Sequence, residues 1–181
     1  MSVGIRLRGS LAMTSSLPEI KLLTGPQAAL HVPLLWDALT PQRRRYAVWD
    51  AGKHHGPTIL SQLVSLGNIA CAAWLDGSLL GIAWVIPVCQ GSRCGLIHML
   101  STGERWQAEA IGNVWIRNVV THYYDSLLAF LPVPFRHIRS MIEDMGFREI
   151  SRLPGGSCLT MRNNRITTAV LYQKDLLDED S

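Results

Sequence analysis

The residues best suited to chemistry lie between positions 94 and 120, where an apolar strand, a polar bend and the start of a helix follow one another. Residues 95–100 predict the strand, which carries one histidine, His98, and residues 101–106 predict the bend. Residues 107–112 then open an amphipathic helix that continues over residues 111–120. Backbone N–H groups at a helix N-terminus lack partners, and the helix dipole places roughly +0.5 charge there. This stretch therefore predicts an anion site, such as one for phosphate.

A family resemblance rests on residues 107–112 and on a turn near the C-terminus. Gln107, Ala110 and Gly112 resemble the pyrophosphate-binding loop of the GNAT superfamily of acyl-CoA-dependent N-acyltransferases, whose pattern is Gln or Arg, two residues, Gly, one residue, then Gly or Ala. Ala110 stands where the first glycine is expected. The turn at residues 145–148, Met-Gly-Phe-Arg, resembles that family's helix-to-strand turn. The order of predicted elements follows the family's order from about residue 20 to residue 176.

The resemblance implies a donor and a reaction. Acetyl-CoA would be the acyl donor, and an acetyl group would move to a primary amine by direct attack, which makes the protein an N-acetyltransferase. The acceptor, a small molecule or a protein, carries no signature in the sequence. Main-chain groups of Leu100 and Thr102 would pair with the pantetheine arm. The backbone of residues 107–112 would bind the pyrophosphate, through Gln107, Ala108, Glu109, Ala110, Ile111 and Gly112.

Two positions of this chain depart from the family's pattern. A tyrosine that acts as an acid in many members falls on Ile142, and an asparagine that often contacts the cofactor falls on Phe135. Tyr123, Tyr124 and Tyr172 are other sources of a phenol, and nothing in the sequence chooses among them. A catalytically inactive GNAT-like binding module that retains CoA binding is therefore the alternative hypothesis.

His98 is the candidate catalytic base. It lies four residues before Thr102, where related enzymes often place a carboxylate that accepts the proton of the amine. Imidazole, with an unperturbed pKa of about 6.5, can accept a proton near neutrality, whereas an amine of pKa about 10 must lose one before it attacks. A core histidine that is hydrogen-bonded to the backbone is the structural alternative.

The surrounding elements predict an α+β fold of the GNAT type, with a mostly antiparallel sheet, helices on both faces and a splayed central strand pair. The splayed pair is expected at residues 96–101 and 126–131. Asp76 and Gly77 predict a hairpin within a three-strand meander. The expected helices cover residues 27–39, 43–51, 58–66, 111–120 and 135–145, and the other expected strands cover residues 20–24, 69–75, 79–88, 148–152 and 166–172, with residues 158–161 as an extension.

Length and composition indicate one core-rich domain. The 181 residues are 48% hydrophobic and 17% charged, with a net charge of +3. We expect a flexible segment at residues 1–17, with Met13 as an alternative start to Met1, a single domain at residues 18–176 and an acidic tail at residues 177–181. The apolar excess is compatible with a homodimer interface.

Localisation and other classes of function follow from the same features. With no apolar run of the ~20 residues that span a bilayer and no secretory signal, we expect a cytoplasmic protein without membrane contact. The four cysteines and the pair at residues 54–55, His-His, lack metal-ligand spacing, so no metal is expected. Residues 43–45, Arg-Arg-Arg, are interpreted as a solvated face. A nucleic-acid or protein contact through these arginines and Trp36, Trp49 or Trp106 is a third hypothesis, and nucleic acid is not the partner we expect.

Overall fold

The strands pair into one mixed sheet in the part of the chain that the structure, a computed structural model, describes: residues 18–41, 43–44, 56–157 and 167–177. The strand order is β1-β2-β3-β4-β5-β7-β6. All pairs are antiparallel except β4 with β5, which is parallel. The strands are β1 (Glu19–Leu23), β2 (Ile69–Leu75), β3 (Ser78–Pro87), β4 (Cys94–Ser101), β5 (Ser126–Pro132), β6 (Arg148–Ser157) and β7 (Thr167–Asp175). The α+β fold with a mostly antiparallel sheet is confirmed.

Two local turns form as their residues predict. Asp76 and Gly77 both have positive φ, of 49° and 77°, which matches the tight turn that a two-residue hairpin with right-handed strand twist requires. At the end of the helix before β6, Gly146 has a φ of 87°, and Phe147 returns to the core with 2% of its surface exposed. Both features are set by short-range backbone geometry, so the sequence was enough to place them.

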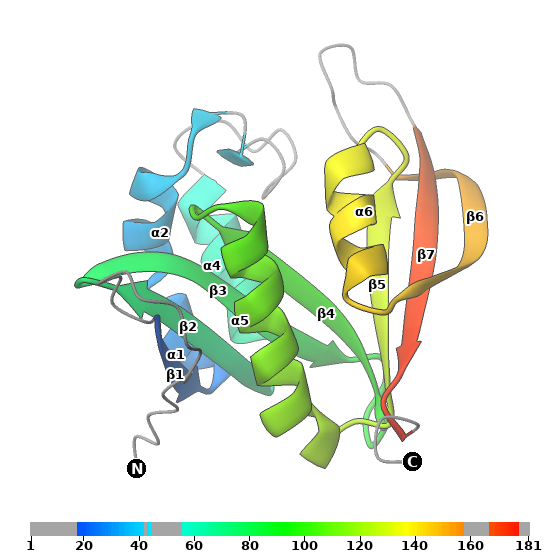
Figure 1. Cartoon of the computed structure of the whole chain (residues 1–181), viewed down its shortest axis with the longest axis horizontal. Coiled ribbons are helices and arrows are strands. Elements are labelled where there is room, and N and C mark those ends of the chain that lie inside the picture. The colour runs from blue at the N-terminus through cyan, green and yellow to red at the C-terminus, as the bar shows by residue number, and fades with distance from the viewer. Residues whose placement is uncertain (1–17, 42, 45–55, 158–166, 178–181) are drawn as a thin grey trace, which may run out of the picture.

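Helices cover both faces of the sheet and define two apolar clusters (Figure 1). One face carries α5 (Arg105–Asn118) and α6 (Arg136–Asp144), which pack through residues such as Trp115 and Ile142. The other face carries α1 (Gly25–Ala29), α2 (Val32–Ala38) and α4 (Gly56–Ser65), which pack through residues such as Leu35 and Leu60. A short 3-10 turn, η1 (Val120–His122), follows α5. Strand residues alternate between the two clusters, as Ala83 and Trp84 of β3 do.

Several predicted elements need correction. The single helix expected at residues 27–39 is two helices, because Pro33 cannot donate to the preceding turn and instead lies in the first turn of α2. The helix α5 begins at Arg105, two residues before Gln107. The apolar run at residues 126–131 is typical of a strand that is buried on both faces, but Phe130 of β5 is 37% exposed. Most of the helix expected at residues 43–51 and the strand extension at residues 158–161 lie outside the described residues.

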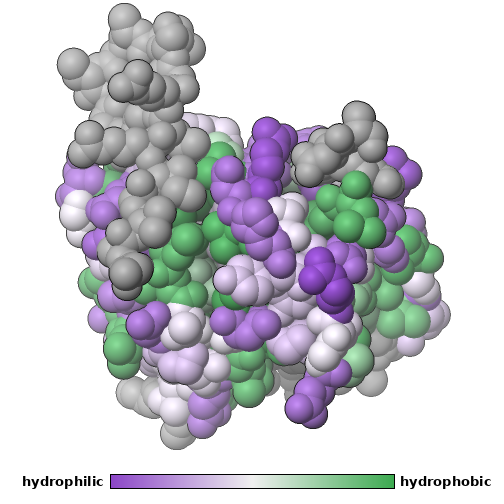
Figure 2. Space-filling view, turned by 90° about the horizontal axis from the view of Figure 1, so that it is seen from below, coloured by the Kyte–Doolittle hydropathy of each residue, from purple (hydrophilic) through white to green (hydrophobic). Residues whose placement is uncertain are grey.

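The surface adds little to the expectations about partners. Large exposed apolar side chains include Leu30, Leu66 and Leu177, which belong to different segments. On the side shown in Figure 2, hydrophobic patches are divided by hydrophilic residues. The homodimer and the division into residues 1–17, 18–176 and 177–181 stay predictions. None of the helices in the described segments is both long and apolar enough to cross a membrane.

A close backbone approach between α1 and the end of α4 yields the first prediction. The Gly25 N–H donates to the Gly67 carbonyl at 3.1 Å, and a Cβ on Gly25 would lie 2.1 Å from that oxygen. Because backbone must move to admit a methyl group, Gly25→Ala should lower the free energy of unfolding by about 2–3 kcal/mol, measured by denaturant unfolding. The exposed control Gln62→Ala should change it by less than about 0.5 kcal/mol. Equal stability of the two variants would contradict the packing described.

Candidate functional site

The parallel strands β4 and β5 stay together over only part of their length. In the described chain their register is Cys94 with Ser126, Gly95 with Leu127 and Leu96 with Leu128, and pairing ends there. Beyond this point β4 continues to Ser101 and β5 continues to Pro132 without pairing to each other. The expected splayed central pair is therefore present, and it creates two strand edges inside the sheet.

The register of β4 with β3 decides which main-chain groups face this opening. The Thr102 N–H donates to the Leu80 carbonyl at 2.7 Å, and the register continues with Leu100 opposite Ile82. Main-chain polar groups alternate in direction along a strand, so those of Leu100 and Thr102 face β3. Those of Met99 and Ser101 face the opening. The prediction that Leu100 and Thr102 offer their main chain to a ligand stays a prediction, and the β4 groups that face the opening belong to the neighbouring residues.

The same argument applies to β5 on the other side of the opening. The Val133 N–H donates to the Thr168 carbonyl at 3.0 Å, and Leu131 pairs with Val170, so odd-numbered residues of β5 bond to β7. The main-chain groups of Phe130 consequently face β4 across the opening. Pro132, the last residue of β5, has no N–H to offer.

The N-terminus of α5 follows β4 directly and carries an acidic cap. Glu104 is the N-cap residue and forms a capping box with Gln107, whose side-chain Oε1 accepts the Glu104 N–H at 2.8 Å. The Gln107 and Ala108 N–H groups donate to the Glu104 carbonyl, at 3.1 and 3.2 Å. The first-turn donors without an intrahelical acceptor therefore belong to Arg105 and Trp106.

The residues predicted to bind pyrophosphate begin in the first turn of α5, and Gly112 lies well within the helix. Ala108 and Ile111 are buried against the sheet, and Ala110 is exposed. Glu109 accepts from the Arg105 Nε at 2.5 Å. A Cβ on Gly112 would lie 2.7 Å from the terminal methyl groups of both Met99 and Met145, so this glycine serves close packing between α5, β4 and the end of α6. The available donors are thus shifted toward the first turn.

Arg43 holds the bend between β4 and α5, a role that sequence reasoning missed. Its Nη1 donates to the Ser101 carbonyl at 2.9 Å and its Nη2 to the Gly103 carbonyl at 3.1 Å. Arg44 donates to the Trp36 and Asp37 carbonyls, at 2.8 and 3.0 Å. The interpretation of these two arginines as a solvated face is therefore wrong. No local signal could have found a fork that joins residues so far apart in the chain.

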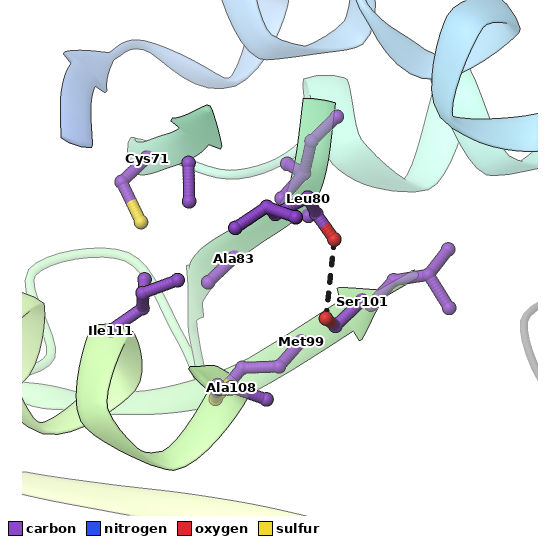
Figure 3. A pocket seen from close by; sticks show the side chains of 11 residues that line it. Cys71, Leu80, Ala83, Met99, Ser101, Ala108 and Ile111 are labelled. Atoms are coloured by element: carbon purple, nitrogen blue, oxygen red, sulfur yellow. Dashed lines mark hydrogen bonds between the residues drawn. The ribbon is translucent and has the colours of Figure 1, made fainter. Parts of the chain in front are cut away.

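A hollow lies beside the same bend, between β2, β3, β4 and the start of α5 (Figure 3). It contains about 300 Å³ of space, part of it open to solvent, and small or apolar side chains such as Ala83, Met99 and Ala108 line it. Ser101 at its rim donates from Oγ to the Leu80 carbonyl at 3.1 Å. Burial raises the pKa of the Cys71 thiol to about 12, so this lining thiol is not a nucleophile at neutral pH.

His98 lies on the opposite sheet face from α5. Its ring stacks on Trp84, its partner across the β3–β4 pair, with centroids 5.0 Å apart. Its Nε2 is buried and has no hydrogen-bond partner among the described residues. Burial lowers the pKa of the imidazole to about 4, so the ring is neutral at pH 7. The hydrogen bond expected for a core histidine is not present at this nitrogen.

Two of the three phenols and both departing positions are packed. Ile142 and Phe135 are 5% and 4% exposed. The Tyr124 hydroxyl donates to Asn68 Oδ1 at 2.5 Å, and the Tyr172 hydroxyl donates to Glu143 Oε1 at 2.9 Å. Tyr123 is exposed. The Tyr124 and Tyr172 hydroxyl groups therefore both donate hydrogen bonds within the fold.

Metal-ligating side chains do not gather in the described segments: no three His, Cys, Asp or Glu residues there could hold an ion together. Among the cysteines, Cys71 is buried and Cys89 is exposed. The histidine pair at residues 54–55 and Cys158 lie outside the described residues. Trp106 is 65% exposed at the start of α5.

Comparison with known proteins places the fold. No family model and no curated protein matches the sequence. Solved structures do match: an N-acetyltransferase from Staphylococcus aureus Mu50, with 14% identity and a TM-score of 0.67, covers 90% of this chain and 100% of its own. An acetyltransferase of the GNAT family from Streptococcus pneumoniae has 15% identity and a TM-score of 0.57, over 88% of this chain and 99% of its own.

A third structure is the ribosomal-protein-S5-alanine acetyltransferase from Vibrio fischeri, which has 13% identity and a TM-score of 0.65 and covers 97% of this chain and 98% of its own. Identities this low establish the fold alone. The chain has the GNAT fold, which confirms the fold that the resemblance implied.

The environment of His98 predicts a pH dependence of stability. Between pH about 6.5 and about 4 the unfolded chain binds a proton that the folded chain refuses, so the free energy of unfolding falls as the pH falls through this window. The loss should reach up to about 3 kcal/mol relative to a His98→Gln variant, which lacks this titration. Denaturant unfolding of both proteins at pH 7, 5.5 and 4 measures the difference. A difference that does not change with pH would contradict a buried neutral imidazole.

Proposed function

We propose that the protein is an N-acyltransferase that moves an acetyl group from acetyl-CoA to a primary amine. The observation that carries this proposal is the opening between β4 and β5, where main-chain groups of Met99, Ser101 and Phe130 face a gap inside the sheet. Unpaired polar groups at a strand edge pair readily with an added extended chain, so a gap of this kind suits a ligand with its own amides. The pantetheine arm of CoA has two amides and can pair there like an added strand.

The residues present fit the rest of the donor. Unpaired N–H groups of Arg105 and Trp106, together with the dipole of a 14-residue helix, suit the pyrophosphate. The Arg43 guanidinium at the adjacent bend adds positive charge on the same side. The Glu104 carboxylate at the N-cap opposes an anion. In this proposal, residues 107–112 remain part of the helix that presents the site. The N–H groups that bind the pyrophosphate directly belong to the residues just before Gln107. The strand contacts with the pantetheine arm are made by Met99 and Ser101 in place of Leu100 and Thr102.

The chemistry requires a neutral amine. Its nitrogen attacks the thioester carbonyl, the C–N bond forms, the C–S bond breaks, and the amine proton leaves as the CoA thiolate takes one up. His98 is the proposed base because its unpartnered Nε2 lies on β4 beyond the point where β5 departs, on the face away from α5. An imidazole with a pKa of about 4 is deprotonated and ready at neutral pH, although its driving force for holding the proton is small.

A second candidate, a GNAT-like module that binds CoA without turnover, is favoured by one observation. Ile142 and Phe135 are buried apolar residues at the two family positions, and the Tyr124 and Tyr172 hydroxyls donate elsewhere. No phenol among these is therefore free to protonate a leaving thiolate. Turnover of a panel of primary amines, followed by thiol release from acetyl-CoA, separates the two candidates.

Binding of acetyl-CoA, with one charge variant, tests the site. Calorimetry should show acetyl-CoA binding to the parent, and mass spectrometry of the native protein should find CoA carried through purification. Glu104→Gln removes a negative charge at the helix N-terminus and should tighten binding by about 2- to 5-fold at low salt, with a smaller gain at high salt. Lys21→Gln, on the distant strand β1, is the control. Absence of binding by the parent would refute the proposal, and weaker binding by Glu104→Gln would refute the placement of the phosphates.

Kinetics of a His98 variant test the proposed base. His98→Ala should lower kcat/KM by on the order of 10²-fold or more, while the Kd for acetyl-CoA stays nearly unchanged. In the parent, kcat/KM should keep rising with pH above pH 6.5, because amine deprotonation and not the imidazole limits the rate there. A loss of activity that is matched by an equal loss of stability or of acetyl-CoA binding would instead identify His98 as structural.

A further inference from the structure

We infer that Arg43 is a positioning residue that sets the end of the β4 edge against the start of α5; this rests on the proposed acetyl-CoA site. The Ser101 carbonyl is one of the β4 main-chain groups that face the opening, and the Arg43 Nη1 donates a hydrogen bond to it at 2.9 Å. The Nη2 of the same guanidinium holds the Gly103 carbonyl at 3.1 Å. One planar group thus spans the bend on both sides of Thr102.

Arg43 is itself held in place. Its N–H donates to Thr40 Oγ1 at 3.3 Å, and the following Arg44 N–H donates to the Thr40 carbonyl at 2.9 Å, which is the pattern of a capped helical turn. The neighbouring Arg44 donates to the Trp36 and Asp37 carbonyls of α2, so its side-chain bonds do not reach the β4–α5 bend. The fork of Arg43 therefore connects the turn that follows α2 to the β4–α5 bend.

The connection has two consequences for a ligand. Because Arg43 donates to the Ser101 carbonyl, an extended ligand at this end of β4 can pair only with the Ser101 N–H and the main chain of Met99. By fixing the Gly103 carbonyl, Arg43 also fixes the peptide that precedes Glu104, and so the direction in which the first N–H groups of α5 point. A ligand that pairs with the edge and places an anion at the helix needs both parts in register.

The fork geometry, rather than charge alone, is what the inference requires. A guanidinium presents parallel N–H groups that reach two carbonyls at once, whereas an ammonium is a point charge on a flexible stem. Arg43→Lys should therefore weaken acetyl-CoA binding almost as much as Arg43→Gln does. Both variants should raise the Kd for acetyl-CoA by about 10-fold, with kcat at saturation changed much less.

The control and a ligand-free readout make the experiment decisive. Arg44→Gln removes two comparable bonds from the same turn and should leave the Kd for acetyl-CoA unchanged. Hydrogen exchange of the peptide that covers residues 101–106, measured without ligand, should accelerate by about 10-fold or more in Arg43→Gln and Arg43→Lys and stay near the parent rate in Arg44→Gln.

Three outcomes overturn the inference: unchanged exchange of residues 101–106 in both Arg43 variants, parent-like affinity in Arg43→Lys, or equal effects of the Arg43 and Arg44 substitutions. If the parent does not bind acetyl-CoA, the proposed function fails. The exchange measurement still decides whether Arg43 positions the bend, so the two failures are distinguishable.

Discussion

The structure depends on the separation of β4 from β5. Each strand is committed to a different neighbour, β4 to β3 along its whole length and β5 to β7, and the two share only the pairs from Cys94 to Leu96. The helix α5 packs on the first half of the sheet and α6 packs beside it, with Gly112 allowing Met99 and Met145 to meet between them. The opening is therefore maintained by packing on either side.

A sheet that parts in its middle has two edges that face each other. Unpaired N–H and C=O groups at an edge bind extended chains readily, and natural proteins usually protect them. Here the protection is partial: Pro132 ends one edge without a donor, and Arg43 covers the Ser101 carbonyl at the end of the other. The groups between these two ends remain directed at the opening, where we propose that the amides of a ligand pair with them.

The charges around the start of α5 balance one another. The Glu104 carboxylate caps the helix, Arg105 bonds to Glu109 and Asp144, and Arg43 lies at the bend. An anion that arrives at this helix must compete with the Glu104 carboxylate, and it gains from the dipole and from Arg43. On the opposite face, His98 stacks on Trp84, and burial of the imidazole favours its neutral form. The proposed anion site and the proposed base therefore lie on opposite faces of the sheet.

The sequence by itself determined the local features: the Asp76-Gly77 hairpin, the bounds of β2, the glycine at the end of α6 and the element order that identifies the GNAT fold. These follow from φ preferences and hydrophobic periodicity, which act over a few residues. Only the tertiary structure decided which alternate set of β4 groups faces the opening, because either set can bond to either neighbour until the register with β3 is known. It also decided the direction of Arg43, since the carbonyls that hold it come from a bend on the far side of the β2–β3 hairpin in the chain. The start of α5 at Arg105 depends on the capping box between Glu104 and Gln107. The pattern read at residues 107–112 does not include Glu104, so it did not predict this start.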